Sequence, residues 1–230
     1  MWKRWYLEGV QVSRKRHHVD SFPVGLEMNC YKRDEHNEYI NGFFSGNLGA
    51  ILKESNPNLF EECKNAYCCT IIRGEAEDDS TLDYMRNTIG FIKALTEQGA
   101  CGVLDLLTFS LLTSDEWEKR FFKKDINAQN HVVILLSKEQ DEYWLHTRGM
   151  AEFGRPDISI KNVTESRLSD CQQIVNQMIF YGGKGAFFNG NVKIHISEEK
   201  SFLIKAELID DFDNDDFNNA YCEVTLLAEE

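Results

Sequence analysis

The chain has 230 residues, of which 42% are hydrophobic and 27% are charged, a composition typical of globular proteins with ample material for a core. Its 38 acidic and 25 basic residues give a net charge of −13 at neutral pH. A field of that sign repels phosphate groups. It therefore argues against nucleic acid and anionic membranes as partners, and it favours a protein with a basic surface.

The cysteine pattern indicates free thiols. The seven cysteines include a cluster at Cys63, Cys68 and Cys69, and no two of the seven have the C-x-x-C spacing of a metal or redox motif. We therefore predict a cytoplasmic protein with reduced, mostly buried thiols and no metal site, with a disulfide as the alternative. No hydrophobic signal region follows the first residues, and no apolar run approaches the ~20 residues of a membrane span.

The first part of the chain has little periodicity. We predict strands at residues 5–12 and 26–31, separated by the basic run 13–18, which we interpret as a solvated loop. Residues 33–47 are polar and then rich in Gly and Asn, which predicts a loop. Residues 48–52 are expected to form a short helix or strand, which a proline breaks five residues later.

A β-α-β unit is predicted over residues 67–104. Residues 67–73 have the composition of a buried strand, and residues 80–99 form a helix that Gly99 ends. The most apolar run of the chain, residues 100–112, begins as a second strand directly after that helix. Such a crossover is expected to be right-handed with its two strands parallel.

The middle of the chain alternates helices and strands. A capping box of Thr113 and Glu116 opens a helix that carries Trp117. We then predict two paired strands, a half-buried strand and a third helix, which Gly182 and Gly183 end. These segments are residues 131–136, 143–147, 158–163 and 164–182.

The pattern of the C-terminal part of the chain, from residue 189 on, predicts β-strands and no helix. Residues 192–196, 202–209 and 221–227 alternate apolar and polar side chains, and an Asn-Gly turn precedes the first of them. We predict an α+β fold: a mixed β-sheet with a β-α-β unit, three main helices and a C-terminal antiparallel meander. One domain over residues 1–230 is favoured, and an N-terminal subdomain over residues 1–62 is the alternative.

The segment Leu145–Ile160 is the richest in residues with special chemistry. Gly149 and Gly154 allow a positive φ or a close backbone approach, and Pro156 fixes φ and makes Arg155 extended. The segment is therefore expected to be a sharp, defined connection between two strands.

Five side chains of this region and its surroundings are candidate ligand-binding residues. Arg148 and Arg155 have planar guanidinium groups suited to a carboxylate or phosphate, and His146 is suited to proton transfer or ligation. Asp157 and the apolar-flanked Asp105 complete the set, and a meeting of Asp105 with Arg148 would strengthen it. The alternative for all five is a structural role in pairing strands and closing turns. We assign no catalytic residue and no cofactor.

The string Thr147-Arg-Gly-Met-x-x-Phe-Gly-Arg-Pro-Asp157 resembles a motif of uncharacterised bacterial families related to suppressor-of-fused-like and immunity proteins. The resemblance covers about a dozen residues. It implies an α+β sandwich and a protein-binding role, and no established reaction.

Two functions follow as hypotheses. The favoured one is a non-catalytic protein-binding domain, such as an immunity or adaptor protein, because no complete catalytic motif is present. The alternative is an enzyme or small-ligand-binding protein with a pocket around Asp105, His146, Arg148 and Arg155. The acidic run 210–216 departs from a calcium loop at its glycine and glutamate positions, so we interpret it as a solvated hairpin loop.

Overall fold

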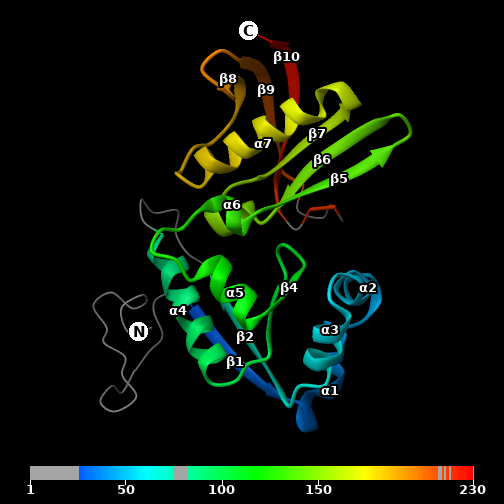
Figure 1. Cartoon of the computed structure of the whole chain (residues 1–230), viewed down its shortest axis with the longest axis vertical. Helices are drawn as coiled ribbons and strands as arrows, with labels where there is room; N and C mark the ends of the chain where they lie inside the picture. Colours follow the sequence, from blue (N-terminus) through cyan, green and yellow to red (C-terminus); the bar gives the residue numbers. More distant parts are fainter. Residues whose placement is uncertain (1–25, 75–81, 212–213, 215, 218, 230) are drawn as a thin grey trace. The chain divides into compact units, whose positions relative to one another are not determined.

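The computed structural model describes residues 26–74, 82–211, 214, 216, 217 and 219–229 (Figure 1). The predicted strand at residues 5–12 and the basic loop 13–18 lie outside these residues. The chain groups into two compact units, residues 1–126 and residues 127–230, and each is described by itself. The single-domain assignment stays a prediction.

The first unit combines two small antiparallel sheets with short helices. Strand β1 pairs with β2, and β3 pairs with β4. Its elements are β1 (Leu26–Lys32), α1 (Arg33–Gly42), α2 (Gly46–Ser55), α3 (Pro57–Lys64), β2 (Cys68–Gly74), α4 (Asp83–Glu97), β3 (Gly102–Asp105), β4 (Ser110–Thr113) and α5 (Ser114–Phe121).

The prediction of a loop at residues 33–47 is wrong, because α1 occupies most of it. The segment lacks an apolar stripe, and hydrogen bonds from the side chain of Arg33, its first residue, stabilise the helix instead. Arg33 Nη1 donates to Asn37 Oδ1 at 2.9 Å and to Asn41 Oδ1 at 3.0 Å, one and two turns further on. Polar side-chain bonds of this kind leave no hydrophobic periodicity to read.

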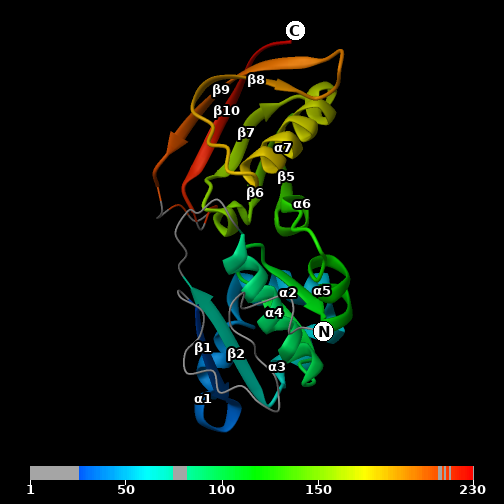
Figure 2. The same cartoon turned by 90° about the vertical axis from the view of Figure 1, so that its left-hand side faces the viewer.

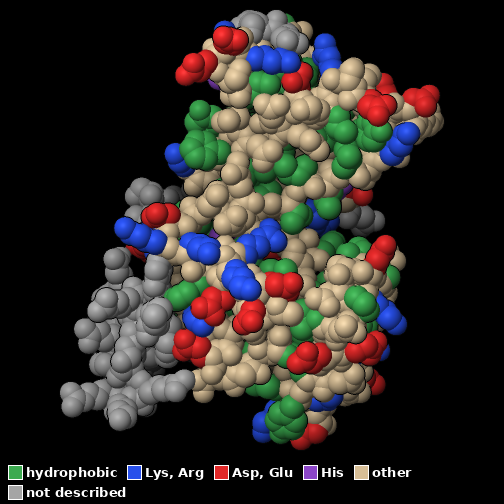
Figure 3. All heavy atoms as spheres, viewed as in Figure 1, with side chains coloured by type: hydrophobic (Ala, Val, Ile, Leu, Met, Phe, Trp, Pro, Cys, Tyr) green, Lys and Arg blue, Asp and Glu red, His purple; other side chains and the backbone are tan. Residues whose placement is uncertain are grey.

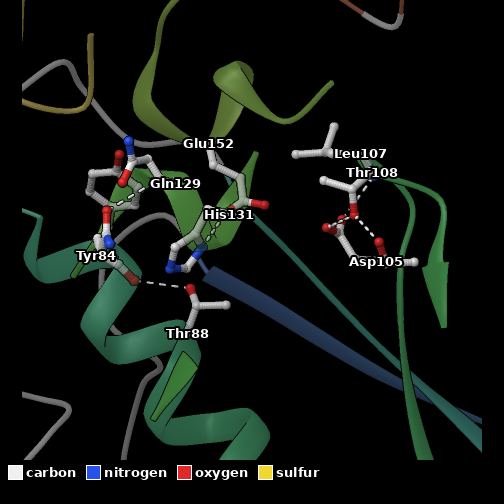
Figure 4. A network of polar contacts seen from close by, with 10 residues as sticks. Tyr84, Thr88, Asp105, Leu107, Thr108, Gln129, His131 and Glu152 are labelled. Atoms are coloured by element: carbon white, nitrogen blue, oxygen red, sulfur yellow. Dashed lines mark hydrogen bonds and ion pairs between the residues drawn. The ribbon is translucent and has the colours of Figure 1, made fainter. Parts of the chain in front are cut away.

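The expected β-α-β unit is also wrong. Helices α4 and α5 form as predicted, but β2 and β3 belong to different sheets. The apolar run 100–112 is a hairpin of β3 and β4, because Asp105 closes a turn in its middle. Its Oδ1 accepts from the Leu107 amide at 2.9 Å and its Oδ2 accepts from the Thr108 hydroxyl (Figure 4).

A small hydrophobic core holds the first unit together. Leu52, Leu59, Phe60 and Leu111 are buried in one cluster, and Phe44 packs edge-on against Phe60. Removal of these side chains from water is the main stabilising contribution to such a cluster. The helix pair α2 and α3 and strand β4 therefore form one packed group.

The second unit is a mixed six-stranded sheet with the order β5-β6-β7-β10-β9-β8. Strand β10 runs parallel to β7 and antiparallel to β9, and the predicted C-terminal meander of β8, β9 and β10 is present. Its elements are α6 (Ala128–His131), β5 (Val133–Glu139), β6 (Glu142–Arg148), the 3-10 turn η2 (Met150–Phe153), β7 (Asp157–Val163), the 3-10 turn η3 (Glu165–Arg167), α7 (Leu168–Gly182), β8 (Gly190–His195), β9 (Ser201–Ile209) and β10 (Tyr221–Glu229).

Helix α7 lies along one face of this sheet (Figures 1 and 2). Its apolar stripe recurs at helical spacing and is completely buried, as are the sheet residues that form the rest of the core. The buried residues of the stripe are Cys171, Ile174, Val175, Met178 and Ile179. Within the described ranges, none of the helices has the length and apolar character that crossing a membrane requires.

Candidate functional site

The segment between β6 and β7 forms a tight corner in the second unit. Gly149 has φ 112° and Gly154 has φ 63°, both in the left-handed region that side chains other than glycine rarely adopt. Between them lies η2, and the Arg155 amide donates back to the Met150 carbonyl at 3.2 Å. The two glycines are therefore explained by backbone geometry, as the sequence predicts.

Asp157 is the hydrogen-bonding centre of the corner. Its side chain is 3% exposed, and its Oδ1 accepts from Thr147 Oγ1 at 2.9 Å and from the Met150 amide at 3.2 Å. Its Oδ2 accepts from Asn219 Nδ2 at 3.2 Å. Burial raises the pKa of Asp157 to about 6, and these three bonds together with the charge of Arg148 act against the rise.

Arg155 is buried and directed at backbone carbonyl oxygens. Its Nε donates to Ala186 at 3.1 Å, its Nη2 to Gly185 at 2.9 Å and its Nη1 to Gly154 at 2.9 Å. The guanidinium thus fixes the connection between α7 and β8 to the corner. A planar group with donors in a fixed fork is well suited to join several carbonyls at once.

Arg148 and His146 lie on β6 and are both buried. Arg148 Nη1 donates to the Asp216 carbonyl at 3.0 Å, which ties the corner to the loop before β10. The ring of His146 stacks on Trp144 at 4.1 Å between centroids and contacts Phe217 edge-on at 5.6 Å. Burial lowers the pKa of His146, and the charge of Arg148 lowers it further, while Asp216 opposes the shift.

The five predicted residues do not form one cluster within a unit. Four of them lie in the second unit, whereas Asp105 belongs to the first. The Asp105 carboxylate accepts two hydrogen bonds inside its own turn, as its structural alternative predicts. Thr147 has no exposed surface, and its hydroxyl is engaged by Asp157 and by the Ile158 amide.

Two contributors to the corner had no signal in the sequence. Asn219 Nδ2 donates to the Arg155 carbonyl at 2.7 Å as well as to Asp157, from a position more than sixty residues away. His131 Nδ1 lies 2.7 Å from Glu152 Oε2, and this pair joins α6 to η2 (Figure 4). Both contacts depend on long-range packing that local pattern does not reveal.

The connection held by Arg155 carries exposed aromatic residues. Phe180 and Tyr181 at the end of α7 are 38% and 44% exposed, and Phe187 in the connection is 56% exposed. Phe180 contacts Tyr181 edge-on at 5.3 Å, and Lys184 Nζ lies 3.8 Å from the centre of the Phe180 ring. We call Phe180, Tyr181, Lys184 and Phe187 the aromatic surface.

The aromatic surface has a defined backbone. The Ala186 and Lys184 amides donate to the Tyr181 carbonyl at 2.9 and 3.0 Å, so the connection folds back over the end of α7. The Arg155 guanidinium carbon lies 5.9 Å from the centre of the Phe187 ring, within the range of a cation–π contact. Arg155 therefore links the corner directly to the aromatic surface.

Among the described residues, no group of three or more His, Cys, Asp or Glu side chains is arranged to hold a metal ion. No family model, curated protein or solved structure matches the chain. The resemblance of the 147–157 string to suppressor-of-fused-like and immunity-related families stays a prediction.

Proposed function

We propose that this chain is a non-catalytic protein-binding domain that uses the aromatic surface as its contact site. The observation that supports this most strongly is the exposure of Phe180, Tyr181 and Phe187 on a backbone that Arg155 fixes in place. Exposed aromatic side chains in a group are characteristic of protein-binding surfaces, where they supply a large share of the binding energy.

A fixed backbone favours binding because less conformational entropy is lost on association. The connection contains Gly183 and Gly185 and directly follows Gly182, the last residue of α7. A chain of this composition would sample many conformations without further constraint. Two bonds from Arg155, to the Gly185 and Ala186 carbonyls, and the two amide bonds to the Tyr181 carbonyl restrict that freedom. The corner thus serves the aromatic surface as a positioning structure.

The charge of the chain indicates the kind of partner. Acidic side chains are spread over the face shown in Figure 3 and are not gathered in one patch, in line with the net charge of −13. Such a field accelerates encounter with a basic protein and disfavours acidic competitors. We therefore propose a partner with a basic surface that meets the aromatic residues, in the cytoplasm. An immunity or adaptor role is the finer proposal, and it rests on the motif resemblance.

The hydrogen bonds of the corner support a structural role over a catalytic one. Asp157 accepts from three donors and Arg155 donates to three carbonyls, all inside the second unit. A catalytic acid or an anion-binding arginine needs its polar atoms directed at a substrate. These atoms are directed at the protein itself.

Affinity capture from cells that express the chain tests the proposal. The wild-type chain and a Leu227→Ser variant, altered at an equally exposed apolar residue of β10, should retain the same partner. A Tyr181→Ser, Phe187→Ser double variant should lose it. Retention by the double variant, or the absence of any specific partner with the wild-type chain, would overturn the proposal.

A further inference from the structure

Two cysteines of the first unit lie in contact although they are far apart in sequence. Cys63 is near the end of α3 and Cys101 directly precedes β3, and their sulfur atoms are 3.6 Å apart. Both side chains are partly buried. A disulfide bond is about 2.05 Å long, so the two sulfurs must approach one another by roughly 1.5 Å to form one.

The two sulfurs can lie this close because residue 102, beside them, has no side chain. Gly102 follows Cys101, and a Cβ atom added at Gly102 would lie 2.8 Å from Cys63 Sγ and 3.1 Å from Leu59 Cδ1. Any other residue at this position would displace the Cys63 sulfur. The glycine thus permits the approach of α3 to the start of β3 that places the two thiols together.

We propose that Cys63 and Cys101 form a reversible intramolecular disulfide when the chain meets a low-molecular-weight disulfide such as glutathione disulfide. In the first step the Cys101 thiolate attacks the oxidant, which forms a mixed disulfide and releases one glutathione. In the second step Cys63 Sγ displaces the second glutathione, which takes up the Cys63 proton. Two thiols are oxidised and one glutathione disulfide is reduced to two glutathione molecules.

The order of the steps follows from the surroundings of Cys63. Burial raises the pKa of Cys63 to about 12, and the neighbouring Cys101 adds to the rise. Cys63 is therefore a thiol at neutral pH, and thiols are poor nucleophiles. We assign the first attack to Cys101 for this reason. Closure of the disulfide should accelerate as the pH rises, because ring closure requires the Cys63 thiolate.

The disulfide would join α3 to the β3–β4 hairpin next to the core of the first unit. Cys63 packs against the cluster of Leu52, Leu59, Phe60 and Leu111. The crosslink would close a loop between positions 63 and 101, which restricts the unfolded chain and raises the melting temperature by roughly 10 °C. The stability of this unit would thus depend on the redox state.

Peptide mapping of the oxidised full chain tests the proposal directly. The protein is incubated with glutathione disulfide, alkylated, and digested with trypsin without reduction. Cys63 falls in peptide 54–64 and Cys101 in peptide 94–119, whereas Cys68 and Cys69 share peptide 65–73 and Cys30 falls in peptide 17–32. The expected product is peptide 54–64 linked to peptide 94–119, and added dithiothreitol should separate the two.

The exposed cysteines of β1 and β2 could form a different disulfide, and one of them provides the control variant. Cys30 and Cys68 are exposed on the paired strands β1 and β2. A link between peptides 17–32 and 65–73 as the main product, or complete alkylation of Cys63 and Cys101 after oxidation, would overturn the proposal. Cys30→Ser should keep both the link and the rise in melting temperature, and Cys101→Ser should lose both. The wild-type map decides the question even if Cys101→Ser does not fold.

Discussion

Thr147 Oγ1 donates a hydrogen bond to Asp157 Oδ1 at 2.9 Å and accepts one from the Ile158 amide at 2.8 Å. One buried hydroxyl thus bridges the end of β6 and the start of β7 and uses its donor and an acceptor in doing so. The contact explains why the corner needs a threonine followed ten residues later by an aspartate, without any chemistry at a substrate.

Replacement of Thr147 by valine should destabilise the second unit. Valine has the same shape but leaves the Ile158 amide without its acceptor. It also removes one of the two donors to Asp157 Oδ1, which keeps the Met150 amide, and we expect a cost of about 1–3 kcal/mol. Urea unfolding of the two proteins measures the difference. Thr225→Val, at an exposed position of β10, is the matched control and should stay near wild type. Equal stability of Thr147→Val and wild type would contradict the role of the hydroxyl.

The stability of the chain should contain a pH-dependent contribution from Asp157. Its pKa is raised from 3.8 to about 6, so between those values the folded protein holds a proton that the unfolded chain has lost. The contribution is fully present below pH 4 and is lost as the pH rises through 6, a fall of up to about 3 kcal/mol. Denaturant unfolding from pH 4 to pH 7 measures it. Asp157→Asn should lack this component, and an identical pH profile for the variant would refute the assignment.

Arg155→Lys should weaken the connection between α7 and β8. Lysine keeps the charge but cannot donate to three carbonyls in a planar fork, so we expect a loss of about 2–4 kcal/mol in the free energy of unfolding. Hydrogen exchange of the Ala186 amide, which donates to Tyr181, should accelerate as well. Lys184→Arg, on the aromatic surface, serves as the control with conserved charge. Unchanged exchange in Arg155→Lys would show that the guanidinium does not hold the connection.

The two glycines at the end of α7 should respond differently to alanine. A Cβ at Gly183 would lie 2.4 Å from Ala128 Cβ, whereas a Cβ at Gly182 would meet the mobile end of Met150, Cε, at 2.6 Å. We expect Gly183→Ala to lose about 1–3 kcal/mol through overpacking. Gly182→Ala should stay within about 1 kcal/mol of wild type, because Met150 can rotate and alanine favours the helix. Thermal unfolding of the pair compares them, and the reverse order would contradict the packing described.

Local pattern was sufficient for the elements that the core defines. The helices α4 and α7 and strands β6 and β7 carry apolar residues at the period of their structure, and each lies close to its predicted range. Prediction from local pattern failed where hydrogen bonds of polar side chains determine the secondary structure. Arg33 orders α1 and Asp105 divides an apolar run into two strands, and neither effect has a period.

The candidate site shows the same division. Gly149, Gly154 and Pro156 were recognisable as a corner because turn residues have a local signature, whereas Asp157 was predicted as a candidate ligand-binding residue. The hydrogen-bond partners of the neighbouring residues could not be predicted from the sequence. Arg155 binds carbonyls of the α7–β8 connection and Asn219 binds Asp157, and both contacts join segments distant in sequence. The exposed aromatic residues were present in the sequence, but only the tertiary structure separates them from residues of the core.

The most direct test of the proposed binding site is the affinity of the captured partner for the Phe187→Ser variant, measured at one salt concentration beside wild type and Leu227→Ser. Because Phe187 is exposed, its replacement should leave folding intact and remove a contact. We expect a dissociation constant at least about tenfold weaker for Phe187→Ser, with Leu227→Ser unchanged. Equal affinity of all three proteins would contradict the assignment of the aromatic surface as the binding site.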